Sequence, residues 1–247
     1  MTTIDHLLDV SMGNVVGHSA VHKFGSNPSM TSGEWDTIWN AGGVYTGFNA
    51  VNAEIVSIVS TSALDTDGGT GLRHIMLYGL DSNGKEQQET VILNGLTPVI
   101  SSLSYLRLNR LRGIDSGLLE YNQGDITARQ SITTAVVFAT MPAGYNTTMI
   151  ACYTIPADKN GYLVAQRASI ANKKAAVVDI RVQSRVLGGV FTVGGEASLN
   201  SVGTGYIEQT FFLPKKLPPM TDIYIEGNAS ANHAAVSAFF DILLVDI

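Results

Sequence analysis

The chain has 247 residues, which is enough to bury a substantial core in one large all-β domain or in two smaller ones. Only 15% of the residues are charged, against about 25% in a typical soluble domain, so we expect other protein to cover part of the surface. A formal charge of -6 disfavours direct nucleic-acid binding, and a single cysteine excludes an internal disulfide or a thiolate zinc site.

The N-terminal sequence lacks both the basic start and the apolar stretch of a secretory signal. Residues 1–48 carry both tryptophans and several Pro- or Gly-rich breaks, but no sustained period. A segment this long and this aromatic is neither an ordinary loop nor a disordered tail. We therefore predict an irregular N-terminal arm that lies on its own body or on a neighbouring subunit. Its candidate interface residues are Phe24, Trp35, Trp39, Tyr45 and Phe48.

The arm also contains a pair of histidines four residues apart, His18 and His22. On a helix this spacing would put both imidazoles on one face. The HExxH zinc motif needs a glutamate after the first histidine, and this chain has Ser19 there. Two arm histidines are therefore preferred over a metal-binding pair.

From residue 49 to residue 247 the pattern changes to short runs of Val, Ile, Thr, Tyr and Phe separated by turn residues. This pattern predicts an all-β body, namely an antiparallel β-sandwich of jelly-roll-like form with extra hairpins. A boundary within the body is placed near residues 114–124. The expected strands are 53–61, 72–80, 88–94, 104–112, 125–130, 133–140, 148–155, 161–170, 175–184, 188–195, 206–213, 222–229 and 234–247.

Two loops rich in Asp, Asn and Gly could be metal sites or corners of the sheet: DTDGGTG at 65–71 and DSNGK at 81–85. Neither has the ligand positions of an EF-hand loop, because both lack a glutamate at position 12. Asp65 and Asp67 remain weak candidate metal ligands. The second loop is predicted to be a hairpin turn, with Asn-Gly in a type I′ conformation, and the first to be a looser corner.

No motif identifies a catalytic nucleophile, phosphate-binding loop or triad, and no carboxylate pair stands out, so the chain is not expected to be an enzyme or to need a cofactor. Cys152 lies in an apolar alternating run and is expected to be a buried, inert thiol. The basic cluster YLRLNRLRG contains Arg107, Arg110 and Arg112. Because a buried arginine needs a partner, ion pairs between subunits or between arm and body are preferred over an exposed anion site.

Two segments near the C-terminus leave alternatives. Residues 234–247 fit an apolar helical stripe as well as a strand, and the β context favours a strand at the centre of a sandwich. Pro214, Pro218 and Pro219 flank two lysines in a segment expected to cross the end of the sandwich, since proline cannot join a central strand.

Several of these motifs together resemble virion structural proteins of tailed phages, particularly phages of marine and aquatic bacteria. The resemblance spans nearly the whole chain, from GNVVGHSAVHKFGSNPSM through DTDGGTGLRHIMLYGLDSNGKEQQETVILNG and YLRLNRLRG to TDIYIEGNAS and FFDILLVDI. It is specific as an overall pattern and weak at any single position.

The resemblance implies a non-enzymatic protein that is made in the host cytoplasm and ends in the virion. The implied partners are copies of itself, as a homo-oligomer expected to be a trimer, and the major capsid protein or other virion proteins, with no direct nucleic-acid or membrane contact. A head decoration, or cement, protein that stabilises the capsid is preferred. A tail, baseplate or fibre-attachment protein is the first alternative, and a carbohydrate-binding β-module is the second.

Overall fold

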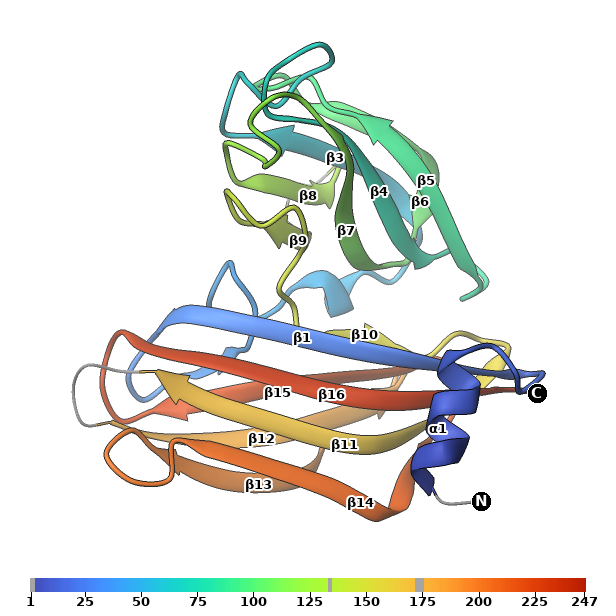
Figure 1. Ribbon diagram of the computed structural model, residues 1–247, viewed down its shortest axis with the longest axis vertical. Coiled ribbons are helices and arrows are strands. Elements are labelled where there is room, and N and C mark those ends of the chain that lie inside the picture. Colours follow the sequence, from blue (N-terminus) through green and yellow to red (C-terminus); the bar gives the residue numbers. More distant parts are fainter. Residues whose placement is uncertain (1–2, 133–134, 172–175) are drawn as a thin grey trace. The chain divides into compact units, whose positions relative to one another are not determined.

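The computed structural model describes residues 3–132, 135–171 and 176–247. As expected, the protein is built from antiparallel sheets; the described residues include one α-helix, α1 (Thr3–Ser11), and one short 3-10 helix, η1 (Gly47–Asn49). The chain forms two compact units, each described by itself (Figure 1). Unit 1 comprises Met1–Ile38 and Ala151–Ile247, and unit 2 comprises Trp39–Ile150.

Unit 1 is a sandwich of two antiparallel sheets (Figure 1). The four-stranded sheet has the order β1 (His18–Met30), β16 (Ala234–Asp246), β11 (Lys159–Ala171) and β14 (Tyr206–Leu217). The five-stranded sheet contains β10 (Cys152–Thr154), β15 (Thr221–Ala229), β12 (Val177–Val186) and β13 (Thr192–Asn200), and β2 (Trp35–Thr37) pairs with β15.

The strands of unit 1 pair in a nested order. The first, β1, pairs with the last, β16; β2 and β10 pair with β15; β11 pairs with β14; and β12 pairs with β13. Successive pairs alternate between the two sheets, which is the topology of a jelly roll. Because β2 and β10 line the same edge of β15, they act as two halves of one strand. Unit 2 is inserted between these halves, and the Ala151 N–H donates to the Ile38 carbonyl at 3.0 Å where they meet.

The C-terminal run is a strand, as the β context predicted. Alternate residues of β16, including Val236, Phe240 and Leu244, are buried in the core of unit 1, while the residues between them are half-buried. A period of two therefore overrides the helical stripe, because β1 and β11 pair with both edges of this segment.

The first 48 residues do not form a single irregular arm. Residues 18–30 are strand β1, residues 35–37 are strand β2, and residues 39–48 belong to unit 2. Strand β1 escaped prediction because its core-facing side carries Lys23, Gly25 and Asn27 in place of the usual apolar residues. A side chain at Gly25 would collide with the backbone, since a Cβ there would lie 2.1 Å from the Ile38 oxygen.

The proline-rich segment also differs from expectation. Pro214 lies inside β14, and Lys215, Lys216 and Leu217 still pair with β11. The physical rule nevertheless holds, because β14 is the edge of its sheet and proline is tolerated there.

Unit 2 is a smaller sandwich with its own core, which includes Ile58, Leu77 and Phe138. One sheet has the order β6 (Val99–Tyr105), β3 (Glu54–Ser60), β8 (Ile126–Gln130) and β9 (Val137–Met141). The other has the order β5 (Glu86–Ile92), β4 (Leu72–Leu80) and β7 (Arg107–Ser116).

Several expectations for unit 2 differ in detail. Strand β6 was not predicted. Residues 133–134 of the strand expected at 133–140 lie outside the described residues. In unit 1, residue 175 of the strand expected at 175–184 also lies outside them. The boundary suggested near 114–124 falls within unit 2, and the chain instead divides after residues 38 and 150.

The DSNGK segment is the hairpin turn between β4 and β5. Gly84 has φ 73°, whereas Asn83 does not have positive φ, so the turn is not type I′. The Gly84 N–H donates to the Asp81 carbonyl at 3.1 Å, and Asp81 Oδ1 accepts from the N–H groups of Asn83 and Lys85, each at 2.8 Å. These bonds describe a three-residue loop with a type I turn followed by a left-handed glycine.

Candidate interaction surfaces

Three of the five aromatic residues proposed as interface contacts are buried in unit 2. Trp39 and Tyr45 pack edge to face with ring centroids 5.1 Å apart, and Tyr45 packs in the same way on Phe48 at 4.9 Å. The Tyr45 hydroxyl donates to the Phe138 carbonyl at 2.9 Å. These side chains are covered by their own chain and support its core.

The other two aromatics lie in unit 1 on opposite outer faces. Phe24 is half-buried on the four-stranded sheet beside His22 and Phe239, with centroids 5.9 and 6.4 Å away. Trp35 is half-buried on the five-stranded sheet, where the Arg181 guanidinium carbon lies 3.7 Å from the centroid of its ring. Both lie on strands of the sandwich.

The three arginines of the basic cluster occupy different environments. Arg107 is fully buried and donates to the carbonyls of Ala50 and Leu106 at 2.8 and 2.9 Å. It therefore supports unit 2 internally, contrary to a role at a subunit interface. Arg110 is half-buried and donates to Thr147 Oγ1 at 3.2 Å, and burial lowers the pKa of its guanidinium. Arg112 is exposed.

Asp65 is the centre of a hydrogen-bond network. Its carboxylate is fully buried and accepts four bonds: from the Leu72 and Gln123 N–H groups at 2.9 and 2.8 Å, and from the Ser60 hydroxyl and Gly124 N–H at 2.6 and 2.9 Å. These four donors occupy both oxygens and tie the loop at 61–71 to the loop at 117–125. The carboxylate is engaged with the protein itself, which is a structural role.

Asp67 does not share this site. Its side chain is 74% exposed, and its Oδ1 lies 4.0 Å from His74 Nε2. Among the described residues, no group of three or more His, Cys, Asp or Glu side chains is placed to hold a metal ion. The two aspartates proposed together as weak ligands are therefore not brought together by the fold.

A second polar side chain, Asn122 in the loop at 117–125, is hydrogen-bonded to another loop of unit 2, at 142–147. Its amide nitrogen donates to the carbonyls of Gly124 and Pro142 at 2.8 and 2.7 Å. Its oxygen accepts from the N–H groups of Tyr145 and Asn146 at 3.1 and 2.9 Å. We call residues 61–71, 117–125 and 142–147 the loop tip. Asp65 and Asn122 hold these three segments in one arrangement.

The loop tip also contains backbone strain. Glu120 has φ 62°, a left-handed conformation that is unfavourable for glutamate, and the Tyr121 N–H donates to the Leu119 carbonyl at 2.8 Å in a three-residue turn around it. The Glu120 carbonyl is held in turn by the Asn146 amide at 2.7 Å. The surrounding bonds therefore impose a conformation that the residue itself disfavours.

This hydrogen-bonded loop tip displays large apolar side chains to solvent. Leu118 is 88% exposed, and four others are roughly half exposed: Leu64, Leu119, Tyr121 and Tyr145. The segments of the tip contain no lysine or arginine, while Asp67, Glu120 and Asp125 are exposed. Preorganised loops that present aromatic and aliphatic groups suit recognition of another protein, because little entropy is lost on binding.

No protein-family model and no curated protein matches this sequence. Weak structural matches are found with infectious bursal disease virus. The Gx strain structure aligns with 93% of this chain and 72% of its own, at 7% identity and a TM-score of 0.26. The Gt strain structure aligns with 94% and 77%, at 7% identity and a TM-score of 0.19. Particles of T=1 symmetry derived from the virus align with 94% and 74%, at 8% identity and a TM-score of 0.19.

These matches are to structures of one virus or of particles derived from it, and none of the three is from a tailed phage. TM-scores this low do not establish a common fold. The jelly-roll assignment of unit 1 therefore depends on its own strand order.

The outer face of the four-stranded sheet carries a line of polar contacts across its strands. His22 Nδ1 lies 2.5 Å from Asp241, Asp241 accepts from Arg167 at 2.9 Å, Arg167 Nε donates to Glu208 at 2.8 Å, and the Tyr206 hydroxyl donates to Glu208 at 2.9 Å. The bond from Arg167 lowers the pKa of Glu208, and the bond to Glu208 raises the pKa of Tyr206. This line of contacts includes His22, which lies on β1 together with His18.

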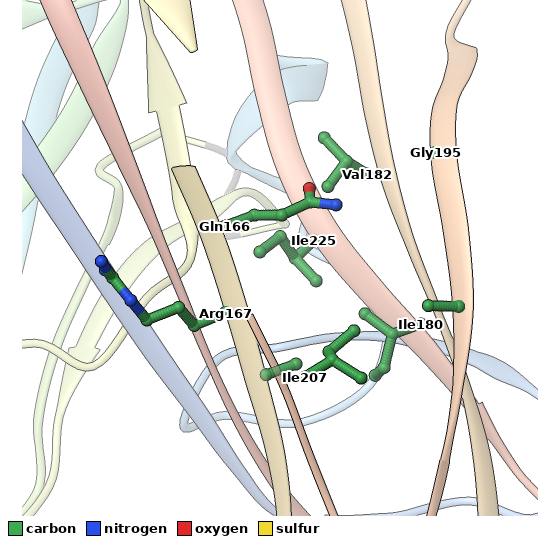
Figure 2. Close-up of a pocket in the computed structure, with 9 residues that line it drawn as sticks. Gln166, Arg167, Ile180, Val182, Gly195, Ile207 and Ile225 are labelled. Carbon is green, nitrogen blue, oxygen red and sulfur yellow. The ribbon is translucent and has the colours of Figure 1, made fainter. Parts of the chain in front are cut away.

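One cavity in unit 1 is small. A cavity of about 10 Å³ lies between the two sheets, roughly the space of one water molecule. Figure 2 shows the Gln166 amide pointing into this space toward Val182 and Ile225, while Arg167 points away from it.

Cys152 is buried as expected, and burial raises the pKa of its thiol well above the ordinary value. No described helix is long and apolar enough to span a membrane.

The loop tip was not identified from the sequence as a surface. Asp65 and Asn122 lie in segments whose composition is typical of turns. Their hydrogen-bond partners, however, lie up to 59 residues away in the sequence. Leu118, Leu119 and Tyr121 are large apolar residues close together in a turn region, interrupted by Glu120, and this pattern could have drawn attention to them.

Proposed function

We propose that this protein is a non-enzymatic structural component of a virion. The observation that carries the proposal is a jelly-roll unit with an inserted β unit whose loop tip is strained and exposes apolar side chains. Low charge content and the sequence resemblance to tailed-phage virion proteins support the same role. Such a tip is suited to docking on another protein, and jelly rolls occur in viral capsid proteins.

More specifically, we propose a head decoration protein that binds the major capsid protein through the loop tip and stabilises the head. Leu118, Leu119 and Tyr121 would enter an apolar recess on the shell, and basic side chains around it would face Asp67 and Glu120. Central apolar anchors with a polar rim are the usual anatomy of a specific interface.

The test is binding to purified heads that lack the protein. Leu118→Asp should reduce retention on heads at least about tenfold, since truncation of an apolar anchor typically costs more than about 1.4 kcal/mol. Val51→Asp is the matched control, because Val51 is also exposed, at 83%. It lies before the first residue of β3, whereas the first segment of the loop tip, residues 61–71, follows the last residue of that strand. Equal retention of both variants would refute docking through the tip.

Copy number distinguishes the alternatives. Hundreds of copies on the head, with a raised capsid melting temperature, would support decoration. About a dozen or fewer copies, in tails separated from heads, would favour a tail, baseplate or fibre-attachment role. Reproducible micromolar binding on a glycan array, lost in Tyr121→Ala, would favour a carbohydrate-binding module.

A further inference from the structure

Strand β14 leaves an apolar edge of unit 1 open. In the described part of the chain it is the last strand of the four-stranded sheet, and it pairs on one side with β11. Most of its 12 residues are exposed, including Phe212 at 96% and Leu213 at 81%. A long exposed edge with apolar side chains favours association with another chain.

Phe212 and Leu213 extend into solvent because the backbone of β14 forms a bulge at these residues. Thr210 pairs with Ala165 and Lys215 pairs with Leu163, so four residues of β14 lie opposite the single residue Val164. Within the bulge, Phe211 packs against the core of unit 1. Phe212 and Leu213 remain outside. The pairing register of β14 therefore places Phe212 and Leu213 in the bulge, and the packing of Phe211 against the core leaves both side chains exposed.

Charges of opposite sign flank Phe212 at equal separations in the sequence of β14. Glu208 lies four residues before it and Lys216 four residues after it. Both face outward, because they pair with Arg167 and Tyr162 on the outer side of β11. If two copies of β14 met antiparallel with Phe212 opposite Phe212, Glu208 of each copy would face Lys216 of the other. No two charges of the same sign would lie opposite each other across the two β14 strands.

We propose that two copies of this chain associate through β14 around a two-fold axis at Phe212. A two-fold contact uses the same surface on both copies, so one strand must be complementary to itself, as the order Glu, Phe, Lys is here. The apolar bulge supplies the centre of the contact, and two Glu208–Lys216 pairs supply its rim. The contact would form whether or not the protein serves in a virion, and it differs from the predicted trimer.

Sedimentation equilibrium of the full chain over a range of concentrations tests the contact. The expected species is a dimer of the 26.3 kDa chain. Phe212→Asp should yield a monomer, whereas Val16→Asp, at a residue that is 95% exposed ahead of β1, should not. A wild-type monomer at all concentrations, or a trimer, would overturn the proposal.

Charge exchange tests the antiparallel alignment itself. Lys216→Glu opposes two pairs of glutamates and should weaken the dimer about tenfold, given a few tenths to 1 kcal/mol for each exposed pair. This loss of affinity should shrink as the salt concentration rises, because salt screens exposed charges. A loss that does not depend on salt would refute the alignment. Thermal melts check that each variant is folded.

Covalent trapping gives an independent measurement. Phe212→Cys would place two thiols at the axis, and mild oxidation should produce a disulfide-linked dimer, whereas Val16→Cys should remain monomeric on a non-reducing gel. Cys152 is buried and does not interfere. Equal cross-linking of the two variants would count against a specific contact at β14.

Discussion

Replacing Asp65 by asparagine should destabilise unit 2 by about 2–4 kcal/mol. The buried carboxylate accepts two bonds at each oxygen. An asparagine amide turned toward Ser60 could donate to that hydroxyl, but the Gly124 N–H would then lose its acceptor. An unsatisfied buried donor costs about 1–3 kcal/mol, and the remaining bonds lose the charge of the acceptor.

Urea unfolding followed by tryptophan fluorescence measures this effect in one unit. The chain has two tryptophans, Trp35 in unit 1 and Trp39 in unit 2. A Trp35→Phe background leaves buried Trp39 as the reporter of unit 2. For a slope of about 2 kcal/mol per molar urea, the midpoint should fall by roughly 1–2 M.

The control is Asp67→Asn in the same loop, where the side chain is exposed. It should change the unfolding free energy by less than about 0.5 kcal/mol. If Asp65→Asn also stayed below about 1 kcal/mol, the carboxylate would not be the structural centre of the loop tip.

Three further changes test other parts of the structure. Glu120→Gly should raise the unfolding free energy of unit 2 by about 0.5–1 kcal/mol, because glycine tolerates φ 62°. Gly68→Ala, at φ 70°, should lower the unfolding free energy by about 1 kcal/mol. A change of the same sign in both variants would contradict the assigned conformations. Gly25→Ala should destabilise unit 1 by more than about 3 kcal/mol in thermal melts, since its Cβ would collide with backbone at 2.1 Å, and a near-native melt would show that β1 is placed wrongly. Cys152 should resist a thiol reagent at pH 8 until the protein is unfolded, because burial both shields the thiol and raises its pKa; rapid native-state labelling would contradict this.

Local chemistry was enough to predict most strands. Residues 72–80 were predicted at the bounds that β4 has, and 222–229 nearly match β15, because both runs alternate clearly between turn residues. Where the core face of a strand is polar, as at Lys23 and Asn27 of β1, the period of two is hidden. Such a strand can be recognised only through its partner, β16.

The sequence by itself determined the all-β class, the hairpin at DSNGK and the burial of Cys152, because each depends on neighbouring residues and on the solvent preference of side chains. Only the tertiary structure decided that β1 closes a jelly roll, that unit 2 is inserted between β2 and β10, and that Asp65 organises a loop tip. These features depend on contacts between residues far apart in the chain, such as the hydrogen bond between Asp65 and Gly124 and the close approach of Gly25 to the Ile38 backbone. Pairings of that kind follow from the packing of the two cores, which local composition does not encode.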